Sequence, residues 1–220
     1  MTKRLVFIVE GDCEVAFVNR KVISYLYTLP EAEGWSMNVQ KITTNRRLNA
    51  KGGNIRFELL KNKVDRVRSQ KGPWITTFFD FFRLPVSFPG YVPGNKNVEK
   101  VETAMAKELE YDRLVPYIQK YEFETLLFAD LSSFKLFDLC DWQIEALHRV
   151  KQEFPNIEDI NGGEQTAPSK RLAAIFPYNK VSDSDILLEK VSLPTLMDSM
   201  PRFKSWIETL ESIIQENPCP

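Results

Sequence analysis

The chain has 220 residues, 43% of them hydrophobic, which is enough for one domain of good size with a core of its own. Its 29 basic and 30 acidic residues leave a net charge of -1, which excludes a histone-like protein and a strongly acidic one. The three cysteines are far apart, so no zinc site is indicated and reduced thiols are the simplest account. No signal peptide or membrane span is visible, so we expect a cytoplasmic protein without membrane contact.

The amino-terminal part of the chain predicts a strand, a helix and a second strand. Residues 5–9 form an unbroken β-branched and aromatic run, typical of a central strand buried on both faces of a parallel sheet. Asp12 is placed to cap a helix that ends before Pro30, and Gly11 lets the backbone turn between the two elements. Residues 37–42 predict the second strand.

Residues 41–71 are the most basic part of the chain. They contain ten basic and two acidic residues, a local charge of +8, while the remainder of the chain sums to -9. Within them, residues 55–68 predict an amphipathic helix with a cationic outer face. The stretch either binds phosphates through its positive charge or is a solvated helix face.

The middle of the chain continues the alternation of strands and helices. Residues 74–79 predict a third strand, residues 98–109 a helix, residues 114–118 a fourth strand and residues 121–128 the start of another helix. The proline-rich residues 85–94 form a surface loop, either a semi-rigid lid or a connection. Beyond residue 131 only helices are indicated, at 142–154, 169–176, 183–190 and 203–214.

This order of elements predicts a doubly wound α/β fold with a mainly parallel sheet and an α-helical C-terminal portion. We expect residues 1–130 to form the α/β catalytic core. Residues 131–220 would form a helical extension packed on that core.

Two acids follow predicted parallel strands, Glu10 after the first and Asp80 after the third. The carboxyl ends of parallel strands meet at one edge of a sheet, where open α/β sheets place their sites. Aromatic residues flank Asp80, so an unpaired charge there is costly, and a cation, a base or a capping amide is needed. Since Mg²⁺ is held by one or two carboxylates with waters and phosphate oxygens, Glu10 and Asp80 suffice as an anchor.

Three further acids are candidates for the same chemistry. Glu14 lies one helical turn after Glu10, within reach of the same ligand, but it also suits the positive end of a helix with no function. Glu122 and Glu124 flank Phe123, and one of them is a candidate to complete a metal shell or act as a base. A third carboxylate would allow a two-metal arrangement.

Several basic and polar residues are candidates for phosphate contacts. The helix start at Ser169, Lys170 and Arg171 offers a hydroxyl, free amides and two charges, or an ordinary helix cap. Lys180 either neutralises a phosphate or faces solvent. The remaining candidates are Arg46, Arg47, Lys51, Arg56 and Arg83. No nucleotide-binding glycine loop and no serine nucleophile elbow is present, and the one histidine, His148, lies in a predicted helix.

Five motifs together resemble one known family. They are IVEG at 8–11 with Glu14, TTFFDFFRLP at 76–85, PYIQKYEFE at 116–124, APSKRL at 167–172 and FKSW at 203–206. In this order, over nearly the whole chain, they resemble the domain-of-unknown-function 4276 family, which is grouped with Toprim-like folds and the overcoming-lysogenization-defect nucleases. The resemblance implies a metal-dependent phosphodiester site with a glutamate after the first strand, matching Glu10.

The same resemblance implies an Asp-x-Asp after the third strand, but here Phe82 stands in the second place after Asp80. Glu122 or Glu124 would have to substitute for a full two-metal site. Family members also look like partners of a separately encoded ATPase in bacterial anti-phage or mobile-element settings.

We therefore expect a Mg²⁺- or Mn²⁺-dependent nuclease acting on DNA or RNA, with homo-oligomers also compatible. The first rival is a catalytically silent subunit that binds nucleic acid or a partner ATPase through the same surfaces. The second rival is a small-molecule phosphotransfer enzyme on the same fold, for which the basic stretch would have no purpose.

Overall fold

A computed structural model of the chain describes residues 3–42, 55–82, 84–160, 163 and 165–217. It divides into two compact units. The sheet unit comprises Met1–Ile118 with Glu211–Pro220, and the helical unit comprises Gln119–Leu210. The predicted division into residues 1–130 and 131–220 stays a prediction.

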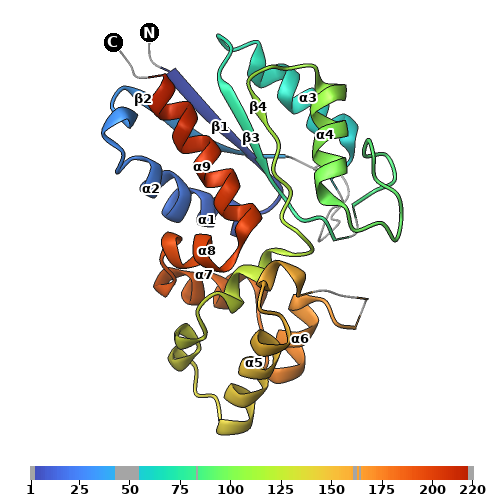
Figure 1. The fold of residues 1–220 in the computed structure, drawn as a ribbon, viewed down its shortest axis with the longest axis vertical. Coiled ribbons are helices and arrows are strands. Elements are labelled where there is room, and N and C mark those ends of the chain that lie inside the picture. The colour runs from blue at the N-terminus through green and yellow to red at the C-terminus, as the bar shows by residue number, and fades with distance from the viewer. Residues whose placement is uncertain (1–2, 43–54, 83, 161–162, 164, 218–220) are drawn as a thin grey trace. The chain divides into compact units, whose positions relative to one another are not determined.

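The sheet unit is built on four parallel strands in the order β2-β1-β3-β4 (Figure 1). The two central strands pair with each other directly, and Leu5 lies beside Trp74 and Val9 beside Phe78. The predicted parallel α/β sheet is therefore confirmed, with all carboxyl ends at one edge. The strands are β1 (Lys3–Val9), β2 (Trp35–Lys41), β3 (Trp74–Phe78) and β4 (Leu114–Val115).

Helices cover both faces of this sheet, as a doubly wound fold requires. Val6 and Ile8 of β1 belong to a core cluster shared with α3 (Phe57–Arg68) and α4 (Val98–Leu109). The opposite face holds Phe78, whose ring stacks on Phe17 at 5.6 Å between centroids. Successive strand residues face opposite ways, so both faces need apolar cover, and this explains the unbroken apolar run of β1.

The helix after β1 is continuous but changes its winding. It passes from α1 (Asp12–Phe17) through a π-helical segment (Val18–Ile23) to α2 (Ser24–Leu26). Pro30 begins a short 3-10 turn after it, so the predicted end before Pro30 is confirmed. Tyr25 donates a hydrogen bond of 2.7 Å to Glu211, which joins this helix to the chain's last helix within the sheet unit.

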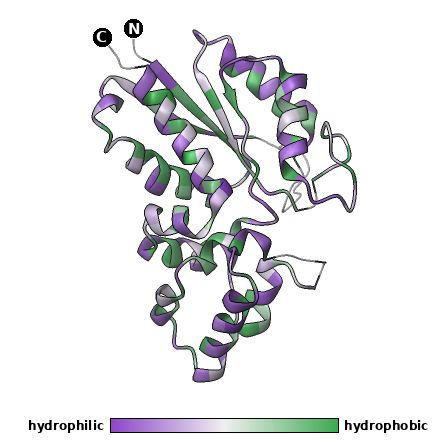
Figure 2. Cartoon of the chain, viewed as in Figure 1, coloured by the Kyte–Doolittle hydropathy of each residue, from purple (hydrophilic) through white to green (hydrophobic). Residues whose placement is uncertain are grey.

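The amphipathic pattern of α3 is also confirmed. Its buried residues are Phe57, Leu60, Val64 and Val67, and its basic side chains lie on the outer face. Figure 2 shows this alternation of hydrophilic and hydrophobic residues along the helices. α4 begins at Val98 and ends at Leu109 as the sequence predicts, capped by Asn97, whose side chain accepts from the Lys100 amide.

The fourth strand is shorter than the predicted 114–118, ending at Val115. Pro116 has no backbone N–H, so it cannot extend the ladder. The Thr77 hydroxyl takes over instead, donating to the Tyr117 carbonyl at 2.9 Å and accepting from the Tyr117 amide at 3.0 Å. The segment therefore continues along β3 without being a strand.

The helical unit contains no strand among its described residues. Its six-residue segment Phe123–Phe128 is a fully buried 3-10 helix in place of the α-helix predicted there, and a helix at Leu193–Ser199 was not predicted. Its other helices are the 3-10 helices Leu131–Leu136 and Ile157–Asp159, α5 (Asp141–Glu153), α6 (Pro168–Ile175), α7 (Lys180–Lys190), α8 (Leu193–Ser199) and most of α9 (Pro201–Glu216). Within the described ranges, no helix is both long and apolar enough to cross a bilayer.

Candidate functional site

The carboxyl edge of the sheet brings together the two acids that the strand pattern predicts there. Val9 pairs with Phe78, so Glu10 follows β1 directly beside the place where β3 ends. Asp80 comes two residues after β3. Both side chains are partly exposed, and Oδ1 of Asp80 is buried. Two carboxylates at the ends of adjacent parallel strands form the position where open α/β sheets bind ligands.

Aromatic rings surround the approach to Asp80 on both sides of the sheet. Phe78 stacks on Tyr117 at 5.7 Å, and Phe79 contacts Phe88 at 5.7 Å between centroids. Phe81 meets Tyr91 edge to face at 5.6 Å. This packing fixes the backbone on either side of the acid, so the carboxylate is held on a rigid support.

Glu14 is almost fully buried and its carboxylate folds back over Gly11. A Cβ at Gly11 would lie 2.6 Å from Oε2 of Glu14. Gly11 itself is extended, with φ of -120°, a conformation that any residue adopts. The backbone bends at Glu10 and Gly11 between β1 and α1, as predicted, but this bend does not require glycine. The missing side chain of Gly11 leaves room for the Glu14 carboxylate.

Asp12 does not cap its helix through its side chain, contrary to the prediction. It occupies the first helical position, and the capping residue is Gly11. The Asp12 carboxylate instead forms an ion pair of 2.6 Å with Lys41, the last residue of β2. Both side chains are substantially exposed, so this pair contributes little stability.

Glu102 is an acid that the sequence analysis missed. It lies on α4, and its carboxylate accepts a hydrogen bond of 2.7 Å from the Ile118 amide. Ile118 immediately follows Tyr117, which lies beside Phe78, so Glu102 approaches the same carboxyl edge as Asp80. The signal available in the sequence was an acid beside the apolar positions Val98, Val101 and Met105 of this helix. In the structure this acid is partly buried.

The basic face of α3 is partly engaged within the fold. Arg68 pairs with Asp65 at 2.8 Å and donates to the Leu109 carbonyl, and Lys61 lies 3.8 Å from Glu108. Burial lowers the pKa of Lys63, and the charge of Arg66 lowers it further. Arg56 is exposed at the start of the helix. The other predicted contacts of this region, Arg46, Arg47, Lys51 and Arg83, lie outside the described residues.

The proline-rich loop at 85–94 is anchored to the sheet unit. Phe88 is 2% exposed and belongs to the core cluster under α3 and α4. Gly90 has φ of +75°, and a Cβ there would lie 2.8 Å from the Ala104 side chain. The loop is packed against α4 at this point, which favours the connecting role over the lid.

In the helical unit, Glu122 serves a helix terminus. Its two carboxylate oxygens accept from the Ser169 amide at 2.9 Å and from the Ser169 hydroxyl at 3.1 Å. Ser169 is the second residue of α6, where backbone amides lack helical partners. The amide and hydroxyl predicted for a phosphate are therefore occupied by an internal carboxylate.

Glu124 is 1% exposed and lies 3.4 Å from Lys180 at the start of α7. Burial raises the pKa of the Glu124 carboxyl, the Lys180 charge opposes this, and the nearby Glu122 charge raises the pKa further. Lys180 also lies over the Phe123 ring at 5.8 Å from the centroid. Lys180 is thus held by an internal acid and an aromatic ring, and the prediction that Glu122 or Glu124 completes a metal shell stays a prediction.

The neighbouring basic residues of α6 differ from each other. Arg171 donates to the Thr166 carbonyl at 2.9 Å, lies 3.4 Å from Glu153 and stacks over the Phe154 ring at 5.0 Å. It is therefore a packing residue of the helical unit. Lys170 is exposed, and its phosphate contact stays a prediction.

Glu158 is a second buried acid at a helix start. It is 1% exposed and accepts from the amides of Arg202 at 2.9 Å and Phe203 at 3.3 Å, in the first turn of α9. Burial raises the pKa of its carboxyl, and these two amides with the charges of Arg202 and Lys120 oppose the rise. Like Glu122 at α6, Glu158 accepts two hydrogen bonds from the first turn of a helix.

A hard cation fits the acids of the sheet edge by donor chemistry. Mg²⁺ takes one or two carboxylates and completes its shell with waters and phosphate oxygens, so Glu10 and Asp80 provide what it needs from a protein. Within the described part of the chain, no three histidine, cysteine or acidic side chains are grouped closely enough to form a metal site by themselves.

Comparison with known proteins identifies the family. No curated protein matches the chain. Among solved structures, the chain is similar to the C-terminal region of the Xanthomonas campestris pv. campestris OLD protein, with 16% identity, a TM-score of 0.47 and 97% of each chain covered. The family model for the domain of unknown function DUF4276 matches residues 9–211. Since this match spans most of its length, the chain belongs to the DUF4276 family.

Proposed function

We propose that this protein is a metal-dependent nuclease that hydrolyses phosphodiester bonds in DNA or RNA. Glu10 and Asp80 would hold Mg²⁺ or Mn²⁺, which would supply activation of water and stabilisation of the leaving oxygen. The single observation behind this proposal is the placement of both acids at the carboxyl ends of the paired strands β1 and β3. The Toprim-like resemblance of the sequence supports the same assignment.

The role of this chain's own residues is to hold the cation and to bind the substrate backbone. The aromatic packing around Phe78 and Phe79 would hold the backbone that carries Asp80 in place. Arg56 stands at the start of α3, and α3 ends just before the amino end of β3, so a 12-residue helix of about 18 Å carries Arg56 toward the carboxyl edge. An exposed cation there suits a phosphate next to the metal.

The proposed setting is a bacterial anti-phage or mobile-element system in which a separately encoded ATPase supplies nucleotide hydrolysis. The absence of a nucleotide-binding glycine loop from the sequence agrees with that division of labour. A catalytically silent subunit that binds nucleic acid or the ATPase is the second candidate. Phe82, in the place where the family pattern has its second aspartate, favours it.

Cleavage of a plasmid and of a mixed RNA pool by the purified protein tests the proposal. We expect cleavage with Mg²⁺ or Mn²⁺, none with EDTA, and a loss of at least about a hundredfold in Glu10→Ala, equivalent to about 2.7 kcal/mol of transition-state stabilisation. Metal-dependent cleavage that survives in Glu10→Ala would overturn the site. No cleavage with retained nucleic-acid binding would establish the silent subunit.

Charge reversal on α3 tests the substrate class separately. Replacing Arg56, Lys63 and Arg66 with glutamate is expected to weaken nucleic-acid binding and to reduce its dependence on salt. Lys107→Glu on α4, an exposed cation of the same unit, is the matched control. Unchanged affinity and salt dependence in the triple variant would count against nucleic acid as the substrate.

A further inference from the structure

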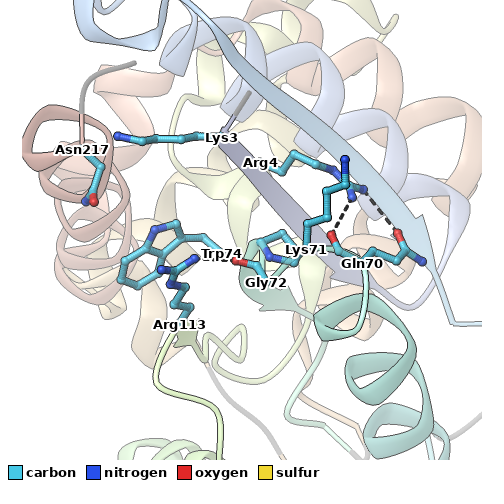
Figure 3. A pocket seen from close by; sticks show the side chains of 9 residues that line it. Lys3, Arg4, Gln70, Lys71, Gly72, Trp74, Arg113 and Asn217 are labelled. Carbon is cyan, nitrogen blue, oxygen red and sulfur yellow. Dashed lines mark hydrogen bonds between the residues drawn. The ribbon is translucent and has the colours of Figure 1, made fainter. Parts of the chain in front are cut away.

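The sheet unit contains a pocket of about 670 Å³ at the edge opposite to Glu10 and Asp80. It lies at the amino ends of the strands, where β1 begins at Lys3, β3 begins at Trp74 and Arg113 precedes β4 (Figure 3). Pockets of roughly 300–1,000 Å³ enclose ligands of the size of a nucleotide. The sequence analysis named no residue of this edge individually as a site, although Lys71 ends the basic stretch 41–71.

The lining of the pocket is strongly cationic. Lys3, Arg4, Lys71 and Arg113 contribute to it, and none of its described lining residues is acidic. Across the described chain, no carboxylate lies within ion-pair distance of Arg4, Lys71 or Arg113. By contrast, Lys41, Lys61 and Arg68 of the same unit each have an acidic partner. Among the described residues, the positive charge of Arg4, Lys71 and Arg113 is therefore concentrated at the pocket without an acidic partner.

Helix dipoles do not account for this concentration of charge. α3 and α9 end immediately before lining residues, and each helix C-terminus carries roughly half a negative charge, about -1 in total. The three cationic side chains without an acidic partner, Arg4, Lys71 and Arg113, exceed that amount about threefold. The excess is left for an anionic ligand.

The pocket wall formed by residues 70–73 is held in place by long-range hydrogen bonds. Arg4 donates to the Gln70 carbonyl at 3.3 Å, Arg113 to the Gly72 carbonyl at 2.7 Å and Tyr111 to the Pro73 carbonyl at 2.5 Å. Figure 3 shows the Arg4 bonds to Gln70. A guanidinium has five N–H donors, so both arginines keep donors for a ligand. The site is consequently built before a ligand arrives.

Two residues of this wall adopt left-handed conformations. Lys71 has φ of +67° and Gly72 has φ of +59°. This conformation is uncommon for lysine, and asparagine or glycine would adopt it with less strain. It places an exposed ammonium group on the rim of the pocket. Strained residues of this kind cluster at binding sites.

Trp74 supplies the apolar surface of the pocket. It is partly exposed although it starts a central strand, and its indole lies among the basic side chains in Figure 3. Aromatic rings stack with nucleobases, and phosphates pair with lysine and arginine. We propose that this pocket binds a nucleotide, either free or as a unit of a nucleic-acid strand, with its base on Trp74 and its phosphates on Lys71 and Arg113.

This proposal does not rest on the nuclease assignment, because the pocket and the two acids occupy opposite edges of the sheet. Calorimetric binding tests it without any cleavage readout. The probes are ADP, a thymidine oligonucleotide of about ten residues and inorganic pyrophosphate, which has the charge but no base. We expect saturable one-to-one binding of ADP or the oligonucleotide, and pyrophosphate at least about tenfold weaker because stacking is lost.

Two pairs of variants locate the binding. Lys71→Asn removes the charge at a left-handed position that asparagine tolerates, and we expect about tenfold weaker binding. Lys107→Asn removes an exposed charge from α4, outside the basic stretch 41–71, and is its control, with unchanged affinity expected. Trp74→Ala is expected to lose affinity that Trp74→Phe, which keeps an aromatic face, largely retains.

Circular dichroism and thermal unfolding show that each variant is folded before binding is compared. The tighter of ADP and the oligonucleotide identifies whether the ligand is free or part of a strand. Absence of saturable binding by both probes at millimolar concentration would overturn the proposal. So would equal affinity for pyrophosphate, or unchanged affinity in both Lys71→Asn and Trp74→Ala.

Discussion

The acids of the helical unit and the acids of the sheet edge occupy different kinds of positions. Glu122 and Glu158 each accept two hydrogen bonds from the first turn of a helix in their own unit, and Glu124 faces Lys180. Glu10 and Asp80 follow adjacent parallel strands at the edge where open α/β sheets place their sites. All five are acids near apolar segments, but only their surroundings distinguish structural carboxylates from candidate ligands.

This difference teaches that burial alone does not mark a functional acid. A carboxylate at a helix N-terminus satisfies amides that have no helical partner, and it interacts favourably with the helix dipole. Its removal should reduce stability and leave ligand binding intact. Removal of a sheet-edge acid should do the reverse. The following variants test this separation.

The largest expected loss of stability follows Glu158→Ala. Two amides of α9 lose their acceptor inside the protein, so the free energy of unfolding should fall by about 3 kcal/mol. Chemical denaturation measures this loss. Glu145→Ala is the control, because Glu145 is exposed in a loose pair with Arg149, and it should change stability by less than about 0.5 kcal/mol. Similar effects of both variants would refute the capping role.

Glu122→Ala should cost about 2 kcal/mol, because the amide and hydroxyl of Ser169 lose one shared acceptor. Ser169→Ala removes only the hydroxyl bond and should cost less. The double variant Glu122→Ala with Ser169→Ala should show a coupling energy of about 1 kcal/mol in denaturation experiments. Additive losses would mean that the two residues act independently.

Asp80→Asn should weaken Mn²⁺ binding by at least about tenfold, or 1.4 kcal/mol, because an amide is a poorer ligand for a hard cation than a carboxylate. Its melting temperature should stay near that of the wild type. Titration calorimetry with Mn²⁺ measures the affinity, and Asp112→Asn, an exposed acid outside the carboxyl edge, is the control. Equal affinity in wild type and Asp80→Asn would remove Asp80 from the metal site.

The smallest effect concerns the pH dependence of stability. Burial raises the folded-state pKa of Glu124 above its usual 4.5, so the folded protein binds this proton more tightly than the unfolded chain. The resulting stabilisation is complete below pH 4.5 and is lost as the pH rises through the folded-state pKa. Glu124→Gln should therefore flatten the decline in unfolding free energy above pH 4.5, measured by denaturation at several pH values. A decline as steep as that of the wild type would assign it to other groups, including Glu158.

Much of the fold follows from patterns that the sequence displays directly. The sequence predicted the apolar runs of β1 and β3, the apolar stripe of α3 and the boundaries of α4. The spacing of apolar residues and the identity of capping residues are local signals, so they can be seen in the sequence. Pro116 accounts for the shortened β4, a signal present in the sequence but not used. The 3-10 helix at Phe123–Phe128 was less predictable, since a fully buried segment shows no amphipathic period.

The candidate sites were predictable in part for a similar reason. Glu10 and Asp80 sit at strand ends, so their meeting at one edge followed from the prediction of a parallel sheet. Glu102 comes from a helix, and the basic pocket draws Lys3, Lys71 and Arg113 from three separate segments. No short sequence pattern connects such residues.

The sequence by itself determined the α/β class, the parallel sheet, the helical C-terminal portion and the edge to which Glu10 and Asp80 belong. Only the tertiary structure decided that Glu122 binds Ser169, that Lys180 faces Glu124 and that uncompensated charge gathers at the amino ends of the strands. The physical reason is the distance along the chain over which each kind of interaction acts. Periodicity and capping act between residues a few positions apart, whereas electrostatic pairing and pocket shape depend on side chains that folding brings together from distant segments.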